Sequence, residues 1–595
     1  MSKQTVGDFI IGRLEQWGIE RVFGYSGDGI NGVMSALRRA EDRVRMIQTR
    51  HEELAAFMAC GHAKYTGQPG VVVTTSGPGA IHALNGLYDA AKDHMPVVAI
   101  LGQQARSSLG SDFQQEVGLD KVLQDVSAYT QTLMTPSQTR HVVDRAMRIA
   151  IAERTVTCVI VPNDLQDAEM SMPAAGHGST FSGTGYRAPA KLMPAEEDLD
   201  AAAEVLNAGE KTAILVGAGV KGAVEPLMAL REKLGAGVAK AILAKTMIAD
   251  NREGVTGTLG LLGTEPSDWM MSECDTLLLV GTSFPYAEFL PHSDKVRAVQ
   301  IDIDASKLGL RFPTEVNLHG SAGDTLEALL PRINRKDNSK WRDKLADHID
   351  RWNGVIAKRA EVKAKPLNPQ KLFWELSPKL PENALLAADV GTATDWYARF
   401  LPIHHEGISG STSGGLASMG NAVPYAIAAK FAYPDRPVIA MVGDGAMQML
   451  GNNGLITVSQ HWKEWADPRL IVLVLNNRDL NQVTWEQRVM EGDPKYETSQ
   501  ALPDFEYDRY AEMLGLKGLK IDKPKRVKSV WDAALRSDRP VVINAIVDPN
   551  VPPLPTHLEM EQVKGYLGAI VKGDEESGSM LRQSLKSMAA SYLRR

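Results

Sequence analysis

Residues 438–450 read VIAMVGDGAMQML, an apolar run of strand length that ends in Gly443-Asp444-Gly445 and continues into helical sequence. The two glycines would let the backbone approach a phosphate group closely, and the following helix would offer free N–H groups to it. Asp444 could then hold a hard cation that neutralises the phosphate charge. Taken alone this segment is a weak signal, because Gly-Asp-Gly is also an ordinary turn sequence.

A second apolar run, LIVLVL at residues 470–475, ends directly in Asn476-Asn477. In a parallel sheet two strands can finish side by side, and α/β proteins bind ligands at that carboxyl edge. Asp444 and Asn477 could therefore bring their side-chain oxygens to one Mg²⁺ ion. The two segments together are far more specific than either alone, and they predict a metal and phosphate site.

Apolar strands alternate with helical stretches in three successive sets, which predicts an α/β protein with helix-covered parallel sheets. A length of 595 residues suits roughly three or four domains. Turn-rich passages at 172–194 and 364–370 separate the sets, so we expect three doubly wound parallel-sheet domains at 1–171, 195–332 and 366–550, then a helical tail at 551–595. Strands are expected at 21–24, 71–75, 97–101, 158–161, 212–216, 276–280, 298–303, 385–388, 438–442, 470–475 and 541–547.

Composition excludes several classes of protein. Hydrophobic residues make up 44% and charged residues 23%, the balance of a soluble globular protein, and the net charge of −7 argues against nucleic-acid binding. No apolar run approaches the ~20 residues that cross a bilayer, and the N-terminus lacks the pattern of a signal peptide. Cys60, Cys158 and Cys274 lack metal-ligand spacing, so we expect three buried thiols in a cytoplasmic protein.

The last stretch, 580–595, predicts an amphipathic helix with a basic side. The simpler interpretation is a helix docked on its own subunit, with cations near its C-terminus to suit the helix dipole. The alternative is a weak contact with an anionic membrane surface, which would make the protein peripheral at the inner face of the membrane. The apolar residues are Leu581, Leu585, Met588 and Tyr592, and the basic ones are Arg582, Lys586, Arg594 and Arg595.

The paired segments resemble the thiamine diphosphate motif, and the chain is identified as a member of the thiamine diphosphate enzymes that include pyruvate oxidase, pyruvate:quinone oxidoreductase and acetohydroxyacid synthase. The resemblance runs from RVFGYSGD near residue 21 to the third set of strands. It implies a pyrimidine-binding first domain, a flavin-type middle domain and a diphosphate-binding third domain. It also implies that Asp444, Asn477 and a backbone carbonyl at Asp479 hold Mg²⁺.

One departure from the family is the spacing of this motif. Asp444 and Asn477 are 33 residues apart (477 minus 444), longer than usual, with HWKEWADP at 461–468 as the extra residues. We expect these residues to lengthen a helix-to-strand connection without moving the ligands. Gly27-Asp28-Gly29 repeats the letters of the motif but has no Asn-Asn after a following strand, so we expect no second metal site there.

The family's catalytic acid is matched by Glu52, in Arg50-His51-Glu52 at the start of a helical stretch. Without the resemblance, a Glu at a helix start is simply a charge that suits the helix dipole. The resemblance implies that Glu52 hydrogen-bonds N1′ of the cofactor's aminopyrimidine and favours the tautomer whose 4′ nitrogen takes the thiazolium C2 proton. We expect the neighbouring Glu53 to lie on the exposed side of the helix.

Two loops of the first domain resemble family segments near the pyrimidine and the substrate. Gly77, Pro78 and Gly79 form a strand-to-helix turn that is either structural or placed beside the cofactor. The segment 110–117 resembles the family's Phe-Gln-Glu loop, with Gln114 in place of the Phe and Gln115 kept. Gln115 is therefore expected to hydrogen-bond the substrate in a more polar pocket.

The third domain is expected to supply most of the cofactor contacts. Met419 matches the bulky residue that bends the cofactor, although a Met in an apolar stretch is often only core. Ala417 and Ser418 precede it, with Ala417 in place of a family Gly, and the loop of Asp389, Gly391 and Thr392 resembles one that meets the diphosphate. The remaining expected contacts in this domain are Gly443, Asp444, Gly445, Ala446, Asn477, Asp479, Leu480, Asn481, Gln482 and Val483.

The middle domain resembles the flavin domain of the pyruvate:quinone enzyme, which implies bound FAD, unless the domain has kept the fold and lost the flavin. Residues 217–222 read GAGVKG and fit Gly-x-Gly-x-x-Gly, but no acid ends the next strand, so a nicotinamide site is not expected. Gln482 stands where the quinone-using relative has Phe, which puts electron delivery to a quinone in doubt. The expected FAD contacts are Gly260, Leu261, Leu262, Gly281, Thr282, Ser283, Phe284, Pro285 and Asp302.

The resemblance implies decarboxylation of a short 2-oxo acid, pyruvate by default, with FAD-linked oxidation to an acyl product. The alternative is a carboligase that makes acetolactate or another acyloin, which the VTWEQR segment with Trp485 favours. A non-catalytic scaffold is a third hypothesis, disfavoured because Glu52, Asp444 and Asn477 are all present. In the family the cofactor lies between the first domain of one chain and the third of another, which implies a homodimer at least and a homotetramer by preference.

Overall fold

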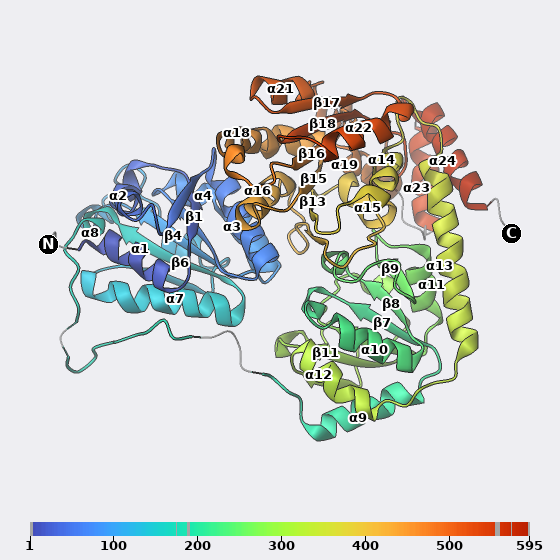
Figure 1. The fold of residues 1–595 in the computed structure, drawn as a ribbon, viewed down its shortest axis with the longest axis horizontal. Helices are drawn as coiled ribbons and strands as arrows, with labels where there is room; N and C mark the ends of the chain where they lie inside the picture. Colours follow the sequence, from blue (N-terminus) through green and yellow to red (C-terminus); the bar gives the residue numbers. More distant parts are fainter. Residues whose placement is uncertain (1–3, 174, 187–190, 554–559, 573, 593–595) are drawn as a thin grey trace.

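Three six-stranded parallel sheets form the framework of the chain in this computed structural model (Figure 1). The structure describes residues 4–173, 175–186, 191–553, 560–572 and 574–592, without the side chains of 560–563 and 587–592. The strand orders are β2-β1-β3-β4-β6-β5, β12-β11-β10-β7-β8-β9 and β14-β13-β15-β16-β18-β17. The prediction of three doubly wound α/β domains is confirmed.

Each sheet uses strands from one region of the sequence. The first contains β1 (Arg21–Gly24), β2 (Arg45–Gln48), β3 (Gly70–Thr74), β4 (Val97–Gln103), β5 (Tyr129–Thr132) and β6 (Val156–Pro162). The second contains β7 (Thr212–Val216), β8 (Gly237–Lys240), β9 (Val255–Thr258), β10 (Thr276–Val280), β11 (Arg297–Asp302) and β12 (Val316–His319). The third contains β13 (Leu385–Ala388), β14 (Ser409–Ser411), β15 (Val438–Gly443), β16 (Leu470–Asn476), β17 (Lys517–Ile521) and β18 (Val541–Ile546).

Helices cover both faces of every sheet, as doubly wound folds require. The first domain has α1 (Val6–Gln16), α2 (Asn31–Arg39), α3 (Glu52–Thr66), α4 (Pro78–His82), α5 (Leu84–Lys92), α6 (Leu119–Val122), α7 (Thr139–Glu153) and α8 (Asn163–Gln166). The middle domain has α9 (Glu196–Ala208), α10 (Val224–Leu234), α11 (Glu265–Glu273) and α12 (Ala322–Leu329), and α13 (Ser339–Ala360) leads onward. The third has α14 (Pro369–Leu376), α15 (Thr392–Phe400), α16 (Ala422–Ala432), α17 (Asp444–Ala446), α18 (Asn452–His461), α19 (Asn481–Glu486), α20 (Glu497–Gln500), α21 (Tyr507–Met513) and α22 (Val527–Leu535), followed by α23 (Met560–Val571) and α24 (Ser577–Tyr592).

Every strand expected from the sequence is present, with ends shifted by two residues at most. The strands that the sequence did not predict are β2, β5, β8, β9, β12, β14 and β17. Most of these are edge strands with half-exposed residues, which lack the continuous apolar run of a central parallel strand. The other two, β8 and β9, are buried but short, and they contain Gly and Lys or Thr, which weakens the sequence signal.

One hydrophobic core is shared between the first and third domains. Helix α3 lies against α16, and both are buried almost all round, as expected of helices enclosed by protein. A Cβ added at Gly61 would lie 2.9 Å from the Cα of Tyr425, so glycine is what allows the two helices to approach so closely. The first and third domains of one chain are therefore packed as a unit (Figure 1).

The middle domain packs its sheet between α9, α10 and α12 on one face and α11 and α13 on the other. Residues 217–222 do not form the turn of a dinucleotide-binding helix, because a short 3-10 turn at Ala218–Val220 comes first and α10 begins only at Val224. The long helix α13 runs along the edge of the molecule from the middle domain to the third, where α24 lies beside it (Figure 1).

The described part of the C-terminal tail is docked on the chain itself. Arg488 and Asp574 form an ion pair that is fully buried, and Tyr566 stacks on Trp485 at 6.3 Å between ring centroids. In α24, Gln583 hydrogen-bonds Asp548, while Leu581 and Leu585 are exposed. These contacts favour the docked helix over the lipid contact. The side chains of Met588, Tyr592, Arg594 and Arg595 lie outside the described residues.

Three smaller expectations concern the thiols, the extra residues and the membrane. Cys60, Cys158 and Cys274 are buried and unpaired, as predicted. Residues 461–468 extend the connection from α18 to β16, and the register still runs from Val438↔Leu470 to Gly443↔Leu475. Among the described helices, none has both the length and the apolar content that a bilayer span requires.

Candidate active site

Asp444 and Asn477 lie at the carboxyl ends of adjacent strands. Strand β15 ends at Gly443, which pairs with Leu475 of β16, so the residues that follow the two strands are neighbours. The Asp444 carboxylate accepts hydrogen bonds from the backbone N–H of Arg478 at 2.5 Å and of Gly445 at 3.0 Å. The two segments singled out in the sequence therefore meet at one edge of the third sheet.

Burial determines the electrostatics of Asp444. The residue is 2% exposed, and burial raises the pKa of its carboxyl to about 7 against the opposing effect of the backbone N–H donors. A bound cation would favour the charged carboxylate and offset this cost. Asn477 lies half-buried nearby, with its side-chain oxygen 3.0 Å from the N–H of Asp479. This set of hard oxygen donors suits Mg²⁺.

The Asp479 carboxylate is already engaged by other side chains. It accepts hydrogen bonds from Thr484 at 2.8 Å and Asn481 at 2.9 Å, and Lys495 lies 3.3 Å away. If Asp479 contributes to a metal site, its backbone carbonyl is therefore the available group, as the family motif implies. Asn481, expected to contact cofactor, instead holds Asp479 and the carbonyl of Pro549.

Asp389 follows β13 and holds the segment that contains Met419. Its carboxylate accepts the N–H groups of Gly420 at 2.8 Å and Ala422 at 3.0 Å. Burial raises the pKa of Asp389 to about 7. The strand order of the third sheet changes direction between β13 and β15, the position at which α/β sheets bind ligands. The Asp389 side chain thus supports the expected site from behind, while Gly391 lies on the wall of the cavity described below.

Met419 comes close to the Gly-Asp-Gly turn. Its sulfur would lie 3.7 Å from a Cβ added at Gly445, and the Leu480 side chain would lie 2.8 Å from that same Cβ. An added Cβ at Gly443 would meet open space among the described residues. Gly445, Leu480 and Met419 therefore gather at one place, and the backbone beside Gly443 is free to be approached by a ligand.

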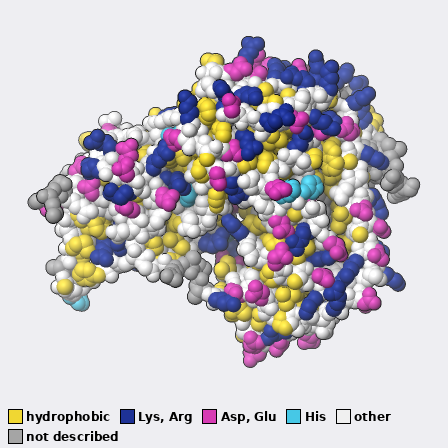
Figure 2. All heavy atoms as spheres, viewed as in Figure 1, with side chains coloured by type: hydrophobic (Ala, Val, Ile, Leu, Met, Phe, Trp, Pro, Cys, Tyr) yellow, Lys and Arg dark blue, Asp and Glu magenta, His cyan; other side chains and the backbone are white. Residues whose placement is uncertain are grey.

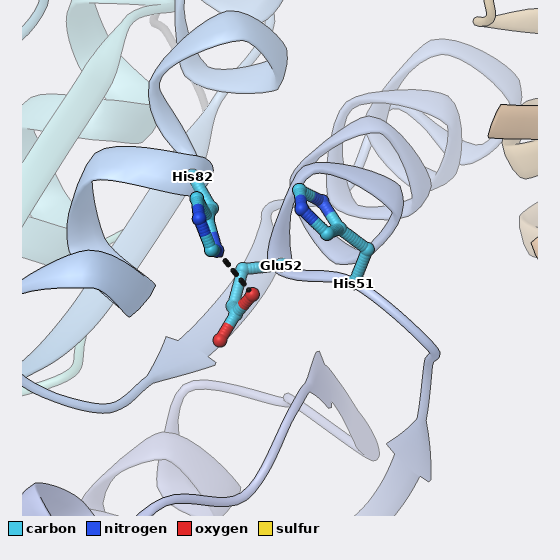
Figure 3. A group of neighbouring side chains, drawn as sticks. All are labelled: His51, Glu52 and His82. Atoms are coloured by element: carbon cyan, nitrogen blue, oxygen red, sulfur yellow. Dashed lines mark hydrogen bonds and ion pairs between the residues drawn. The ribbon is translucent and has the colours of Figure 1, made fainter. Parts of the chain in front are cut away.

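Glu52 begins α3 in the first domain and points to His82 of α4 (Figure 3). Its carboxylate lies 2.9 Å from Nδ1 of His82 and would lie 3.2 Å from a Cβ added at Gly79. His51 caps the helix by accepting the Glu53 N–H at 3.2 Å, and its ring stacks on His82 at 4.5 Å. The three polar ends lie within 4.8 Å of one another, a spacing that metal ions can also use.

Gln115 lies beside the Gly77 turn, as the family loops imply. Its side-chain oxygen accepts the Ser76 hydroxyl at 3.2 Å, and its carbonyl would lie 2.7 Å from a Cβ added at Gly77. Both Gly77 and Gln115 have positive φ, 56° and 62°. Pro78 and Gly79 open α4 next to Glu52. The expected residues of the first domain therefore form one group.

A large cavity of about 3650 Å³ runs between the three domains. Figure 2 shows the face hollowed between the lobe of the first domain and that of the middle domain, with Lys and Arg side chains gathered in the hollow. Arg154, Lys221 and Lys307 line this part of the cavity. Lining residues that the sequence singled out are Leu261, Leu262, Gly281, Thr282, Ser283, Phe284, Pro285, Asp302, Gly391, Ala417, Gln482 and Val483.

Most of the expected FAD residues thus line the cavity, at the carboxyl ends of β9, β10 and β11, and the strand order of the middle sheet reverses between β10 and β7. A Cβ added at Gly281 would lie 2.5 Å from the Cα of Gly219, so the loop after β10 contacts the loop after β7. The cavity lies above these two loops. Gly260 does not line the cavity. It has φ 97°, and an added Cβ would meet the Phe284 ring at 2.9 Å, so its place is in the turn behind the wall.

Within one chain the groups of the first and third domains remain apart. Among the described residues no hydrogen bond or ion pair joins Glu52 to Asp444 or Met419, and none of the three lines the cavity between the domains. Thr392 and Ala446 lie in the first turns of α15 and α17, and Ser418 hydrogen-bonds Asn85 of the first domain. The site expected from the family would need both groups, so one chain shows it as two halves.

Sequence reasoning missed several polar residues. The expectation that Glu53 is exposed was wrong, because its carboxylate accepts a hydrogen bond from Asn85 at 2.6 Å and is mostly buried. His82 was missed because one His in an apolar helix carries no pattern, although its place four residues after the Pro78 turn was visible. Glu486 was missed as well: it lines the cavity and accepts the Gln482 amide at 3.0 Å.

Comparison with known proteins finds three family models along the chain. They describe the N-terminal, central and C-terminal domains of thiamine pyrophosphate enzymes and match residues 4–124, 199–329 and 389–545. A Bacillus subtilis (strain 168) protein with the name "putative thiamine pyrophosphate-containing protein" is 34% identical over 98% of this chain and 99% of its own length. The pyruvate oxidase of Lactiplantibacillus plantarum is 29% identical, covering 92% and 89%. A probable acetolactate synthase large subunit of Methanocaldococcus jannaschii is 28% identical, covering 91% of each.

Proposed function

Because the chain belongs to the thiamine pyrophosphate enzymes, we propose that it decarboxylates a short 2-oxo acid, pyruvate by default, and passes the electrons to FAD with release of an acyl product. The observation that carries the proposal is the meeting of Asp444 and Asn477 at the ends of adjacent strands, while Glu52 starts a buried helix in the first domain. Thiamine diphosphate, when bound, supplies a thiazolium carbon that adds to the ketone and accepts electrons as carbon dioxide leaves.

The third domain would hold the diphosphate end of the cofactor. Asp444, Asn477 and the Asp479 carbonyl would bind Mg²⁺, and the open backbone at Gly443 would face the phosphates. Met419 would support the bend of the cofactor next to Gly445. Glu52 would hydrogen-bond N1′ of the pyrimidine, and His82, 2.9 Å from that carboxylate, would orient it.

We infer that two copies of the chain complete one site. Neither Glu52 nor Asp444 lines the cavity between the domains, and no hydrogen bond joins them among the described residues, yet the reaction needs both groups on one cofactor. Glu52 from one copy and Asp444 from another would satisfy this requirement, so a dimer is the smallest active assembly and a tetramer is compatible with it. The substrate would enter near Gln115 and Gln482, whose amides can bind its carboxylate or carbonyl.

The cavity supports FAD in the middle domain. Arg154 and Lys221 line it, with Asp302 as the acid that acts on Arg154, and cations of this kind suit the diphosphate of a dinucleotide. Asp302, whose pKa is raised by burial, lies at the end of β11 on the same wall. The cavity continues to Gln482 and Ala417, so a flavin bound there would reach the proposed thiamine site.

A carboligase is the second candidate. Gln482 and Glu486 give the wall a polar character that suits a second carbonyl substrate. Trp485, which suggested synthases, is 2% exposed, donates its indole N–H to the Pro549 carbonyl and stacks on Tyr566, so its role is chiefly structural. In this alternative the acyl group would pass to an acceptor ketone or aldehyde, and FAD would be idle or absent.

The two candidates are separated by mixing the purified protein with pyruvate, thiamine diphosphate and Mg²⁺ in the absence of oxygen. Bleaching of bound flavin in step with carbon dioxide release supports the oxidase. Acetolactate or acetoin without flavin reduction identifies the carboligase.

The catalytic role of Glu52 is tested with the same assay. Glu52→Gln should lower carbon dioxide release by about 100-fold or more, because the amide cannot exchange a proton at N1′. Glu41→Gln, a change at an exposed residue, is the matched control and should leave turnover unchanged. Full turnover by Glu52→Gln contradicts the mechanism, whereas a wild type without turnover favours the scaffold hypothesis.

A further inference from the structure

A buried ion pair of the first domain contacts a loop of the third. Lys64 near the end of α3 and Asp93 after α5 form a short ion pair with side chains 4% and 1% exposed. Burial lowers the pKa of Lys64, but the nearby carboxylates Asp93 and Asp89 outweigh it and raise that pKa above its usual value. Because both side chains are almost fully buried, their remaining hydrogen-bonding capacity must be used within the protein.

That capacity is used by the backbone of residues 412–418, which we call the cofactor loop. Asp93 accepts the N–H of Gly414 at 2.9 Å and of Gly415 at 2.5 Å, and Lys64 donates to the carbonyl of Thr412 at 2.6 Å. Three backbone groups within four residues, at Thr412, Gly414 and Gly415, are thus bonded to these two side chains. Hydrogen bonds to charged groups are stronger than neutral ones, so the loop is firmly held at this end.

Steric contact restricts the loop as well. A Cβ added at Gly415 would lie 2.7 Å from the Lys92 carbonyl, so the loop backbone rests directly against the end of α5. Farther along, Asn85 of α5 donates to the Ser418 hydroxyl at 2.9 Å. At the far end Asp389 accepts the N–H of Gly420. The loop is therefore fixed on both sides, and Ala417 between them has the strained φ of 54°.

We propose that the Lys64–Asp93 pair is a positioning element of the thiamine site, which fixes the cofactor loop so that Ala417 and Met419 meet the pyrimidine in the reactive geometry. The inference rests on the proposed function, because it assigns Ala417 and Met419 to the cofactor. Neither Lys64 nor Asp93 touches reacting atoms in this assignment. They act through the loop, where a displacement of about 1 Å can cost about 100-fold in rate.

Helix α3 then serves two sites. Glu52 at its first turn would act on the cofactor held by another copy, and Lys64 at its last turn holds the cofactor loop of its own chain. Between these two ends of α3, the Cys60 thiol donates a hydrogen bond to the buried Asp89 carboxylate of α5. The Tyr425 hydroxyl of α16 donates to the same carboxylate, so polar contacts link the three helices. The packing of the first domain on the third is thus part of the site, not only a scaffold for it.

The test compares Asp93→Asn with Asp144→Asn in the full-length protein. Asp144 forms an equally buried ion pair with Arg13 in the same domain, with side chains 0% and 9% exposed, and has no contact with the cofactor loop. The first measurement is amide hydrogen exchange in residues 412–418 without cofactor. Asp93→Asn should raise the exchange rate at Gly414 and Gly415 by about tenfold or more, since its amide loses the charged acceptor. Asp144→Asn should leave that rate unchanged.

The second measurement is the exchange of the C2 proton of thiamine diphosphate bound with Mg²⁺, with all sites saturated. Asp93→Asn should slow it by about tenfold or more, and Asp144→Asn should match the wild type. Unchanged loop exchange or C2 exchange in Asp93→Asn, or an equal slowing in Asp144→Asn, overturns the proposal. A wild type that binds no thiamine diphosphate refutes the proposed function, and with it the positioning role, while the loop exchange still decides whether the pair fixes the loop.

Asp93→Asn leaves Lys64 buried without its carboxylate and could fail to fold. Gly415→Ala then provides the test, because it keeps both charges and pushes the loop away from the Lys92 carbonyl. Gly354→Ala in α13, where an added Cβ meets open space among the described residues, is its control. Gly415→Ala should slow C2 exchange to the same extent as predicted for Asp93→Asn, and wild-type exchange in Gly415→Ala contradicts the proposal.

Discussion

Glu52 and Asp444 are both acids at a strand-to-helix junction, yet their surroundings differ. Glu52 opens a helix of 15 residues, and its carboxylate lies 2.9 Å from Nδ1 of His82, an ionisable side chain. Asp444 also opens a helical run, which continues through a π-turn and α18 to His461, but its hydrogen bonds come from backbone N–H groups, and burial raises its pKa to about 7. One acid has an ionisable side chain beside it, and the other has backbone N–H donors and no cationic side chain within ion-pair distance among the described residues.

These two environments suit a carboxylate to two different functions. An acid that the fold leaves without a counter-charge is suited to bind a cation, because the ion removes the cost of burying the charge. An acid with an ionisable neighbour is suited to hold or exchange a proton. The proposed site uses one of each, and they come from sheets that lie far apart in the sequence.

The largest expected effect is the difference in cofactor affinity between Asp444→Asn and Glu52→Gln. Asp444→Asn should weaken thiamine diphosphate binding in the presence of Mg²⁺ by about 100-fold or more, because a neutral amide cannot balance the metal charge. Glu52→Gln should keep binding within about threefold, since it retains a hydrogen bond to N1′. Titration calorimetry measures both. Equal losses in the two variants would remove the distinction between a binding acid and a catalytic acid.

His82→Asn tests the neighbour of Glu52. Loss of a charge-assisted hydrogen bond costs about 1.5 kcal/mol or more, which should lower carbon dioxide release about tenfold with little change in cofactor affinity. His141→Asn, in α7 away from Glu52, serves as the control. Steady-state kinetics gives the answer, and an unchanged kcat would assign His82 a purely structural part.

The smallest effect concerns pH and the buried acid Asp389. Burial raises its pKa from 3.8 to about 7, so between these values the folded protein holds a proton that the unfolded chain has released. Its contribution to the free energy of unfolding therefore falls as pH rises through this window, by up to about 1.4 kcal/mol per pH unit. Asp389→Asn cannot titrate. The thermal midpoint of the wild type relative to this variant should fall between about pH 5 and about pH 7, and a constant difference would contradict the raised pKa.

The fold class could be predicted because it depends on local patterns of apolar residues. Central strands such as β4, β10 and β16 are continuous apolar runs that a parallel sheet buries on both faces. Edge strands such as β5 and β17 carry half-exposed residues and gave no such signal. Most of the missed strands follow from this rule, since their pairing depends on a neighbour strand and not on their own composition, whereas β8 and β9 are buried but short.

The candidate site could be predicted only in part. Asp444 and Asn477 follow strands that pair directly, so the sequence signals of two strand ends were enough to bring them together. Gly260, an expected FAD contact, does not line the cavity, and a Cβ added there would meet the Phe284 ring at 2.9 Å, so its FAD contact stays a prediction. A resemblance between sequences does not tell which side of a turn a residue occupies in the structure.

The sequence by itself determined three parallel α/β units and the acid and amide that end two adjacent strands, because both are encoded by short-range patterns of apolar and turn residues. Only the tertiary structure decided that α3 packs on α16, that His82 meets Glu52 and that Lys64 and Asp93 hold the backbone of Gly414 and Gly415. Those contacts join residues separated by 30 to more than 300 positions. Their geometry arises from burying helices together, which no local spacing specifies.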